Sequence, residues 1–247
     1  MVDTLDSLKA FLQTLPSTTQ SISPLYIDLE GNDLSRHGTI SLMTILIPST
    51  SKVYLIDIHT LGAAAFTTSS EPKNVTLQQI LESKNVEKVF FDVRNDSDAL
   101  FSLFGIRLEG INDLQLMELG ARRRSKTLVS GLAWCIEQNS HLSAEEKATW
   151  RASKQEGNRL FDPAKGGSYA VFDQRPLPDE ILKYSVQDVV HMPGLFRIYS
   201  GRLSAWWWER VREETVARVA LSQSAGFDGK GRHMDLGPSV WQVGNRR

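Results

Sequence analysis

The chain has 247 residues, of which 41% are hydrophobic and 23% charged, and its formal net charge is −1. This composition is typical of a globular protein with one sizeable core and room for a small appendage. No apolar run approaches the roughly 18 residues of a membrane span, so we expect no membrane insertion. The near-neutral charge argues against coating a long duplex by charge alone, although it is compatible with a local groove for a short strand.

The N-terminus and the cysteine content give expectations about the compartment. The first 15 residues place leucines at helical spacing, and they lack the basic start and continuous apolar stretch of a signal peptide. Cys135 is the single cysteine, so a reducing compartment is the default. We therefore expect an intracellular protein of the cytoplasm or nucleus.

Apolar segments predict strands early in the chain. Between residues 24 and 58 the stretches LYIDLEG, ISLMTILI and KVYLIDI are joined by short connections, which predicts an antiparallel meander. A short helix near residues 76–81, a fourth strand at 87–91 and a helix at about 95–104 are expected next. Strands first and interleaved helices later indicate an α/β layer fold with a mixed sheet.

The rest of the chain is expected to be mainly helical. An irregular insert, KQEGNRLFDPAKGGSYAVFDQRPLP, precedes a strong helix that starts near Asp179. A charged helix that opens with three tryptophans follows, and then a Gly-rich segment. We expect one domain over residues 1–205, with residues 206–247 forming a C-terminal helix and tail that packs on the domain or meets a protein partner.

The first strand carries two acids on one face. Period-2 alternation in LYIDLEG places Leu25, Ile27 and Leu29 on one face, and Asp28 and Glu30 on the other. Two carboxylates so close repel each other, whereas a divalent cation would be held by the pair. A solvent-facing strand edge is the alternative.

A further acid falls on a predicted buried stripe in VFFDVRNDSDALFSLFGIRL. Helical phase puts Asp96 with Ala99, Leu100 and Leu103 on the face toward the sheet, and it points Asp98 toward solvent. An acid on a buried stripe is unfavourable unless something pairs it. Capping of the helix N-terminus is the alternative role.

The strong helix near Asp179 repeats this pattern. Tyr184 and Asp188 stand four residues apart in LPDEILKYSVQDVVHMPGLFRIY, so a phenol lies one turn before an acid on a core-facing surface. His191 shares the stripe, and we expect it to be packed or hydrogen-bonded rather than catalytic.

Together these segments resemble the three exonuclease motifs of the DEDD superfamily, in its tyrosine-bearing DEDDy branch. The likeness is to RNase D-like exonucleases and Egalitarian-type 3′–5′ exonuclease domains. IDLEG matches the first motif, the FGI-x-L tail aligns the aspartate of the second motif with Asp96, and RPLPDEILKYSVQDVVHMPGL matches the third. Phe91 stands where the family often has His, and Lys183 stands where the histidine branch would need His, which assigns the tyrosine subtype.

The resemblance implies a ribonuclease H-like fold, with helices on both faces of a mixed sheet, and a two-metal mechanism. Asp28, Glu30, Asp96 and Asp188 would bind two Mg²⁺ or Mn²⁺ ions, and Tyr184 would orient the attacking water. The implied activity is 3′–5′ exonuclease hydrolysis of single-stranded nucleic acid, with RNA favoured over DNA. The alternative is a degenerate exonuclease-like domain that binds RNA or protein without cutting.

Substrate contacts are harder to assign from the sequence. A single strand would be held by aromatic stacking and backbone contacts. The candidates are Phe161, Tyr169, Phe172 and Lys165 in the insert, and Arg36 and His37 after the first strand. A basic cluster at residues 122–126 is interpreted as a solvated face.

Overall fold

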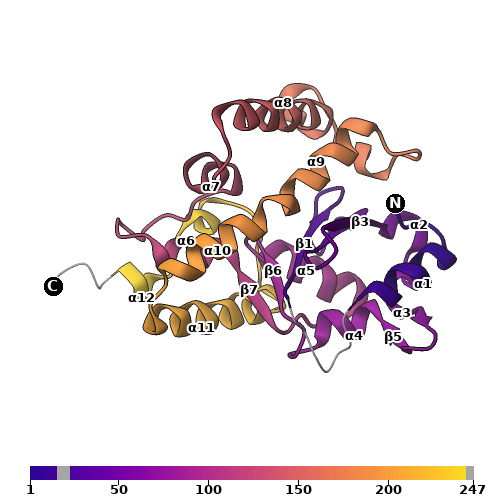
Figure 1. Cartoon of the computed structure of the whole chain (residues 1–247), viewed down its shortest axis with the longest axis horizontal. Helices are drawn as coiled ribbons and strands as arrows, with labels where there is room; N and C mark the ends of the chain where they lie inside the picture. The colour runs from indigo at the N-terminus through magenta and orange to yellow at the C-terminus, as the bar shows by residue number, and fades with distance from the viewer. Residues whose placement is uncertain (16–22, 243–247) are drawn as a thin grey trace.

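The computed structural model describes residues 1–15 and 23–242, and a five-stranded sheet lies at its centre (Figure 1). The strand order is β3-β2-β1-β6-β7. β1, β2 and β3 form the expected antiparallel meander, whereas β6 and β7 run parallel to β1, so the sheet is mixed. The strands are β1 (Leu25–Glu30), β2 (Leu42–Ile47), β3 (Lys52–Asp57), β6 (Lys88–Phe90) and β7 (Ile111–Asp113), with a separate two-stranded ribbon of β4 (Ser69–Ser70) and β5 (Val75–Thr76).

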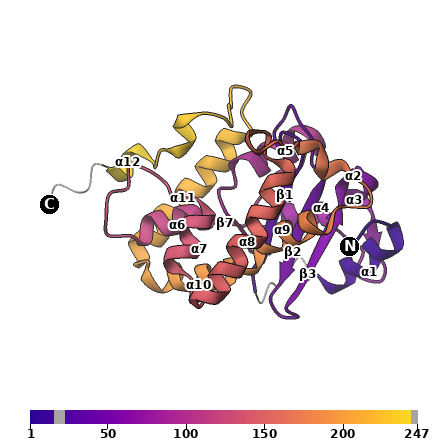
Figure 2. The same ribbon diagram turned by 90° about the horizontal axis from the view of Figure 1, so that it is seen from above.

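Helices cover both faces of the sheet, as expected (Figures 1 and 2). The helices of the first half are α1 (Leu5–Thr14), α2 (Ile58–Leu61), α3 (Ala64–Thr67), α4 (Leu77–Glu82) and α5 (Arg94–Phe104). Those of the second half are α6 (Leu114–Ala121), α7 (Leu132–Asn139), α8 (Ala144–Phe161), α9 (Asp179–Val190), α10 (Met192–Arg202), α11 (Ala205–Ser222) and α12 (Ser239–Gln242), with short 3₁₀ turns at Pro163–Lys165, Tyr169–Asp173 and Arg232–Asp235.

The two faces of β1 belong to different cores, which follows from its alternation. Leu25, Ile27 and Leu29 pack with α1, α4 and α5 in one cluster. Tyr26 joins a second cluster with α6, α10 and α11 on the opposite face. The acids of β1 share the face of Tyr26 and therefore point toward the helices of the second half.

The expectation of an irregular insert is wrong for its first eight residues, which are helical. Ser143 and Glu146 form a capping box that starts α8, and the helix then continues through the insert's first eight residues to Phe161. Gly157 lies inside this helix, where a single glycine is tolerated. Helix α8 packs along α9, which begins after Pro178 with Asp179 and Glu180 in its first turn (Figure 1).

The C-terminal segment packs on the sheet and its neighbouring helices. Helix α11 contacts α5, α6 and β7, and the buried Arg218 donates to Asp113 over 2.8 Å. Trp206 is 58% exposed, whereas Trp207 and Trp208 pack against the second core, so the three tryptophans face different ways. None of the helices within the described residues is long and apolar enough to cross a membrane.

Candidate active site

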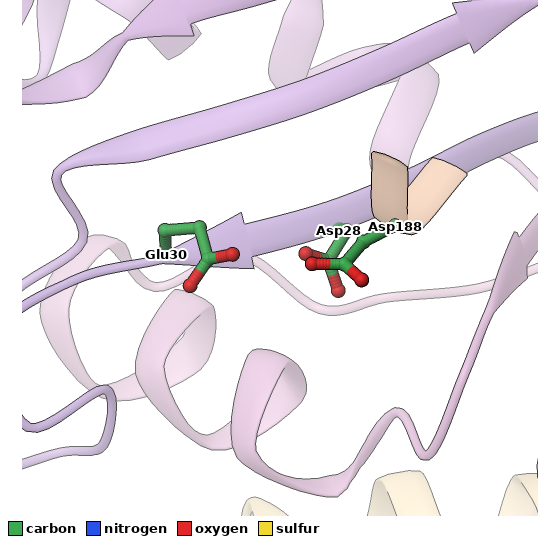
Figure 3. A group of neighbouring side chains, drawn as sticks. All are labelled: Asp28, Glu30 and Asp188. Atoms are coloured by element: carbon green, nitrogen blue, oxygen red, sulfur yellow. The ribbon is translucent and has the colours of Figure 1, made fainter. Parts of the chain in front are cut away.

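Three carboxylates meet beside the end of β1. Asp28 and Glu30 leave the strand on the same face, and Asp188 approaches from α9. One carboxylate oxygen from each lies within 4.8 Å of the other two. Figure 3 shows Asp28 and Asp188 side by side with the carboxyl group of Glu30 turned toward them. The structure thus brings together three of the four acids that the sequence analysis singled out.

Asp96 approaches the same acids from the first turn of α5. Its side chain is buried, and its Oδ1 has no hydrogen-bond partner among residues 1–15 and 23–242. It lies close enough that its charge raises the pKa of both Asp28 and Glu30, although its oxygens are outside the tight group of three. Burial raises the pKa of Asp96 itself to about 8.

The properties of Asp28, Glu30 and Asp96 fit a site for divalent cations. Burial first, and then the neighbouring carboxylates, raise the pKa of Asp28 well above its ordinary value. The pKa of Glu30 is raised well above its ordinary value by burial first and then by Asp188. Hard oxygen ligands and an orphaned buried carboxylate oxygen fit Mg²⁺ or Mn²⁺, which favour such ligands over the nitrogen and sulfur of zinc sites.

Tyr184 lies one turn before Asp188 and is fixed by α8. A Cβ atom at Gly157 would stand 2.6 Å from Cβ and Cδ2 of Tyr184, so only glycine allows the two helices this approach. Phe161 meets the same ring edge-on, with centroids 4.9 Å apart. Burial and the neighbouring carboxylates raise the pKa of Tyr184, which therefore stays a neutral phenol.

A cavity of about 470 Å³ opens from Glu30 and Tyr184. Phe161, Tyr169 and Phe172 line it, so the structure brings these three candidates into one cavity with Glu30 and Tyr184. Phe161 stacks on Tyr169 at 5.8 Å, and Tyr169 is 40% exposed. The cavity therefore offers aromatic surface beside the carboxylates.

The remaining substrate candidates lie elsewhere. Arg36 is held by Asp98 and by three backbone carbonyls near the end of α11. His37 lines a neighbouring cavity, and Lys165 pairs with Asp162 at 3.2 Å. His191 is hydrogen-bonded, with Nε2 3.1 Å from Oε1 of Gln187, as expected.

The expectation that Asp98 faces solvent is wrong, although Asp96, Ala99 and Leu100 are buried as expected. Asp98 is 1% exposed, and its carboxylate accepts hydrogen bonds from the backbone N and Nε of Arg36, both at 2.8 Å. Leu103, expected on the buried stripe, is 38% exposed. The loop after β1 covers the side of α5 that helical phase alone assigned to solvent.

Some side chains of the basic cluster at residues 122–126 bind the C-terminal end of α6. Lys126 donates to the carbonyls of Leu119, Gly120 and Arg122 at the C-terminus of α6. Arg122 pairs with Glu118 at 2.8 Å, whereas Arg124 lies over the ring of Trp134. Only part of this cluster is therefore a solvated face.

Sequence reasoning missed Lys154. Its Nζ lies 2.5 and 2.7 Å from the two carboxylate oxygens of Asp188 and 3.2 Å from the ring centroid of Tyr184. Lys154 stands three residues before Gly157, so the two share one face of a helix. This relation could not be used for prediction because the segment was expected to be irregular.

Comparison with known proteins adds independent evidence. A family model described as 3′–5′ exonuclease matches residues 1–200. The mouse piRNA biogenesis protein EXD1 is 38% identical over 97 residues, and its human counterpart is 36% identical over 95 residues. These matches cover 39% and 38% of this chain but only 15% and 17% of the relatives, which are much longer proteins.

Solved structures share the fold. A crystal structure of Trypanosoma brucei RNase D in complex with GMP superposes with a TM-score of 0.75 at 24% identity, covering 98% of this chain and 69% of that one. Escherichia coli RNase D superposes with a TM-score of 0.61 at 16% identity, covering 91% of this chain and 50% of that one. The architecture is therefore that of RNase D, as the sequence motifs implied.

Proposed function

Because the chain belongs to the 3′–5′ exonuclease family, we propose that it is a metal-dependent exonuclease that removes nucleotides from the 3′ end of single-stranded RNA. The observation that carries the proposal is the convergence of Asp28, Glu30 and Asp188, beside Asp96, whose Oδ1 has no hydrogen-bond partner among the described residues. Two half-buried acids, Asp28 and Glu30, and two buried ones, Asp96 and Asp188, gain nothing from this arrangement unless cations bind between them.

Asp28, Glu30, Asp96 and Asp188 would hold two divalent ions. Such ions, when bound, supply an activated water and stabilise the 3′ oxygen as it leaves. Brucella melitensis NrnC, solved with bound Mg²⁺, shares the fold at a TM-score of 0.56 and 17% identity, which favours Mg²⁺ as the first ion to test.

The protein's own groups would position the reactants. The hydroxyl of Tyr184 stays protonated and can donate or accept a hydrogen bond, so it can orient the water toward the last phosphodiester. Tyr169, which is 40% exposed, and the half-buried Phe161 would stack on the terminal bases, which binds a strand with little sequence preference. Phe172 is 1% exposed and would support the ring of Phe161 from below. RNA is the preferred class because the fold is shared with Trypanosoma brucei RNase D, which was solved in complex with RNA U12.

The second candidate function is a binding module without catalysis. It is favoured by the partial match to relatives whose name denotes piRNA biogenesis rather than hydrolysis. Against it, all four acids and the tyrosine are present in the sequence, and Asp28, Glu30 and Asp188 lie within 4.8 Å of one another. We therefore place catalysis first.

One assay separates these functions. Matched 5′- and 3′-labelled oligonucleotides of RNA and DNA, single-stranded and duplex, are incubated with Mg²⁺, Mn²⁺ or EDTA. An exonuclease shortens the 5′-labelled single strand stepwise from its 3′ end and loses this activity in EDTA. Binding of every substrate without shortening would establish the module instead, and cleavage of a circular strand would contradict an exonuclease.

A further inference from the structure

Lys154 supplies a positive charge at the acidic site. Its ammonium bridges both oxygens of Asp188 at 2.5 and 2.7 Å, and its side chain is 14% exposed. Within the described residues, no other lysine or arginine forms an ion pair with the acids at positions 28, 30, 96 and 188. Its charge also favours the ionised forms of Asp28 and Glu30.

The backbone of Lys154 is fixed while its head group can move. Gly157 and Phe161 follow it along the same face of α8, and both lie against Tyr184. This packing holds the helix beside α9. The four-carbon stem of lysine nevertheless lets the ammonium change partners without any movement of the helix.

Charge counting shows when such a change is favourable. Four carboxylates bring at most four negative charges, which two divalent ions neutralise. A phosphodiester then adds one negative charge and gains another as its bond breaks. Once Asp188 binds metal, the half-buried ammonium of Lys154 loses its counter-ion, and an unpaired charge in that position is unfavourable.

We propose that Lys154 exchanges partners: it pairs with Asp188 in the metal-free protein, competes there with the metal, and turns to the phosphate of the terminal nucleotide once metal is bound. This inference rests on the proposed function, because it requires a metal at Asp188. It makes Lys154 a residue of substrate binding. The opposite reading is a clamp, in which Lys154 holds Asp188 in the geometry that metal needs.

The two readings predict opposite changes in metal affinity. If Lys154 competes, Lys154→Met tightens Mn²⁺ binding by about tenfold, since a rival for Asp188 is gone. Lys154→Arg weakens it, because a guanidinium can bind both oxygens of a carboxylate at once. A clamp predicts weaker binding in Lys154→Met. Lys183→Met removes the same charge from an exposed position of α9 and serves as the control.

The experiment is calorimetric titration of Mn²⁺ into the full chain, followed by binding of a single-stranded RNA in Ca²⁺ at several salt concentrations. We expect Lys154→Met to bind RNA about tenfold more weakly and with a salt slope smaller by about 0.7, which is one phosphate contact. Wild-type chain that binds no Mn²⁺ would overturn both the inference and the proposed function. If the wild-type chain binds Mn²⁺ and Lys154→Met binds Mn²⁺ with equal or weaker affinity, the inference alone is overturned. Should Lys154→Met not fold, Lys154→Arg decides, because equal or tighter metal binding in that variant contradicts competition.

Discussion

Asp96 and Asp98 lie two residues apart on α5, and substituting each by asparagine should give opposite phenotypes. On the proposed function Asp96 would bind metal, and its Oδ1 has no partner among the described residues. Asp98 is buried against Arg36. We therefore expect substitution of Asp96 to change the activity and substitution of Asp98 to change the stability of the fold.

For Asp96→Asn we expect activity to fall by roughly a hundredfold or more, because a metal ligand contributes several kcal/mol to the transition state. The metal-free protein should be as stable as the wild type or more so. Burial raises the pKa of Asp96 to about 8, so folding at pH 7 requires this carboxyl group to take up a proton that it does not hold in the unfolded chain. Asparagine is neutral in both states, so the variant avoids this unfavourable proton uptake.

For Asp98→Asn we expect the free energy of unfolding to fall by about 2–3 kcal/mol. A hydrogen bond to a charged group contributes roughly 1.5–3 kcal/mol, and asparagine keeps one acceptor for Arg36 but loses the charge. Three carbonyls still accept from the guanidinium, which limits the loss. The melting temperature should drop by roughly 5–10 °C. Activity per folded molecule should stay within about threefold of wild type.

The assay combines urea unfolding in EDTA with cleavage of 5′-labelled RNA at 20 °C and matched folded concentrations. A double variant with Arg36→Met checks the partnership, because the effects of Asp98→Asn and Arg36→Met should not add. The reasoning fails if Asp98→Asn is inactive at wild-type stability while Asp96→Asn is active.

Three further outcomes follow from the site. Tyr184→Phe should lower kcat by about tenfold or more with little change in KM, since the hydroxyl acts mainly in the transition state; an unchanged kcat would make Tyr184 a packing residue. Gly157→Ala should also lower kcat by displacing Tyr184, whereas Gly194→Ala, whose added Cβ meets nothing within 4 Å, should not, and equal activities would refute the packing argument. Mg²⁺ affinity should rise between pH 6 and pH 8, because the pKa of Asp96 is raised to about 8 and metal binds the ionised carboxylate. The metal-free protein should lose stability as the pH rises from about 4 to about 8, because Asp96 ionises in the unfolded chain but keeps its proton in the folded protein. A flat profile in both measurements would contradict the cation site.

The strands and motif acids could be predicted because they depend on local periodicity. Alternation in β1 was enough to place Asp28 and Glu30 opposite Leu25, Ile27 and Leu29, and the structure confirms that arrangement. The i, i+4 spacing placed Tyr184 and Asp188 on one side of α9 in the same way. β7 has only three residues, too few for a periodic signal.

What the sequence did not reveal depends on distant contacts. Asp98 is buried by Arg36, which lies 62 residues away, so helical phase alone assigned it to solvent. Lys154 was overlooked because Gly157 suggested irregular backbone, whereas tertiary packing against Tyr184 makes use of that glycine within the helix. Both errors concern side chains whose partners come from other elements.

The claim that these acids form a two-metal site is tested most directly by diffraction from crystals soaked in Mn²⁺. The account predicts two anomalous peaks about 4 Å apart, bound by Asp28, Glu30, Asp96 and Asp188, with the ammonium of Lys154 moved away from Asp188. It is contradicted if no peak forms there at saturating Mn²⁺ and Lys154 still bridges Asp188.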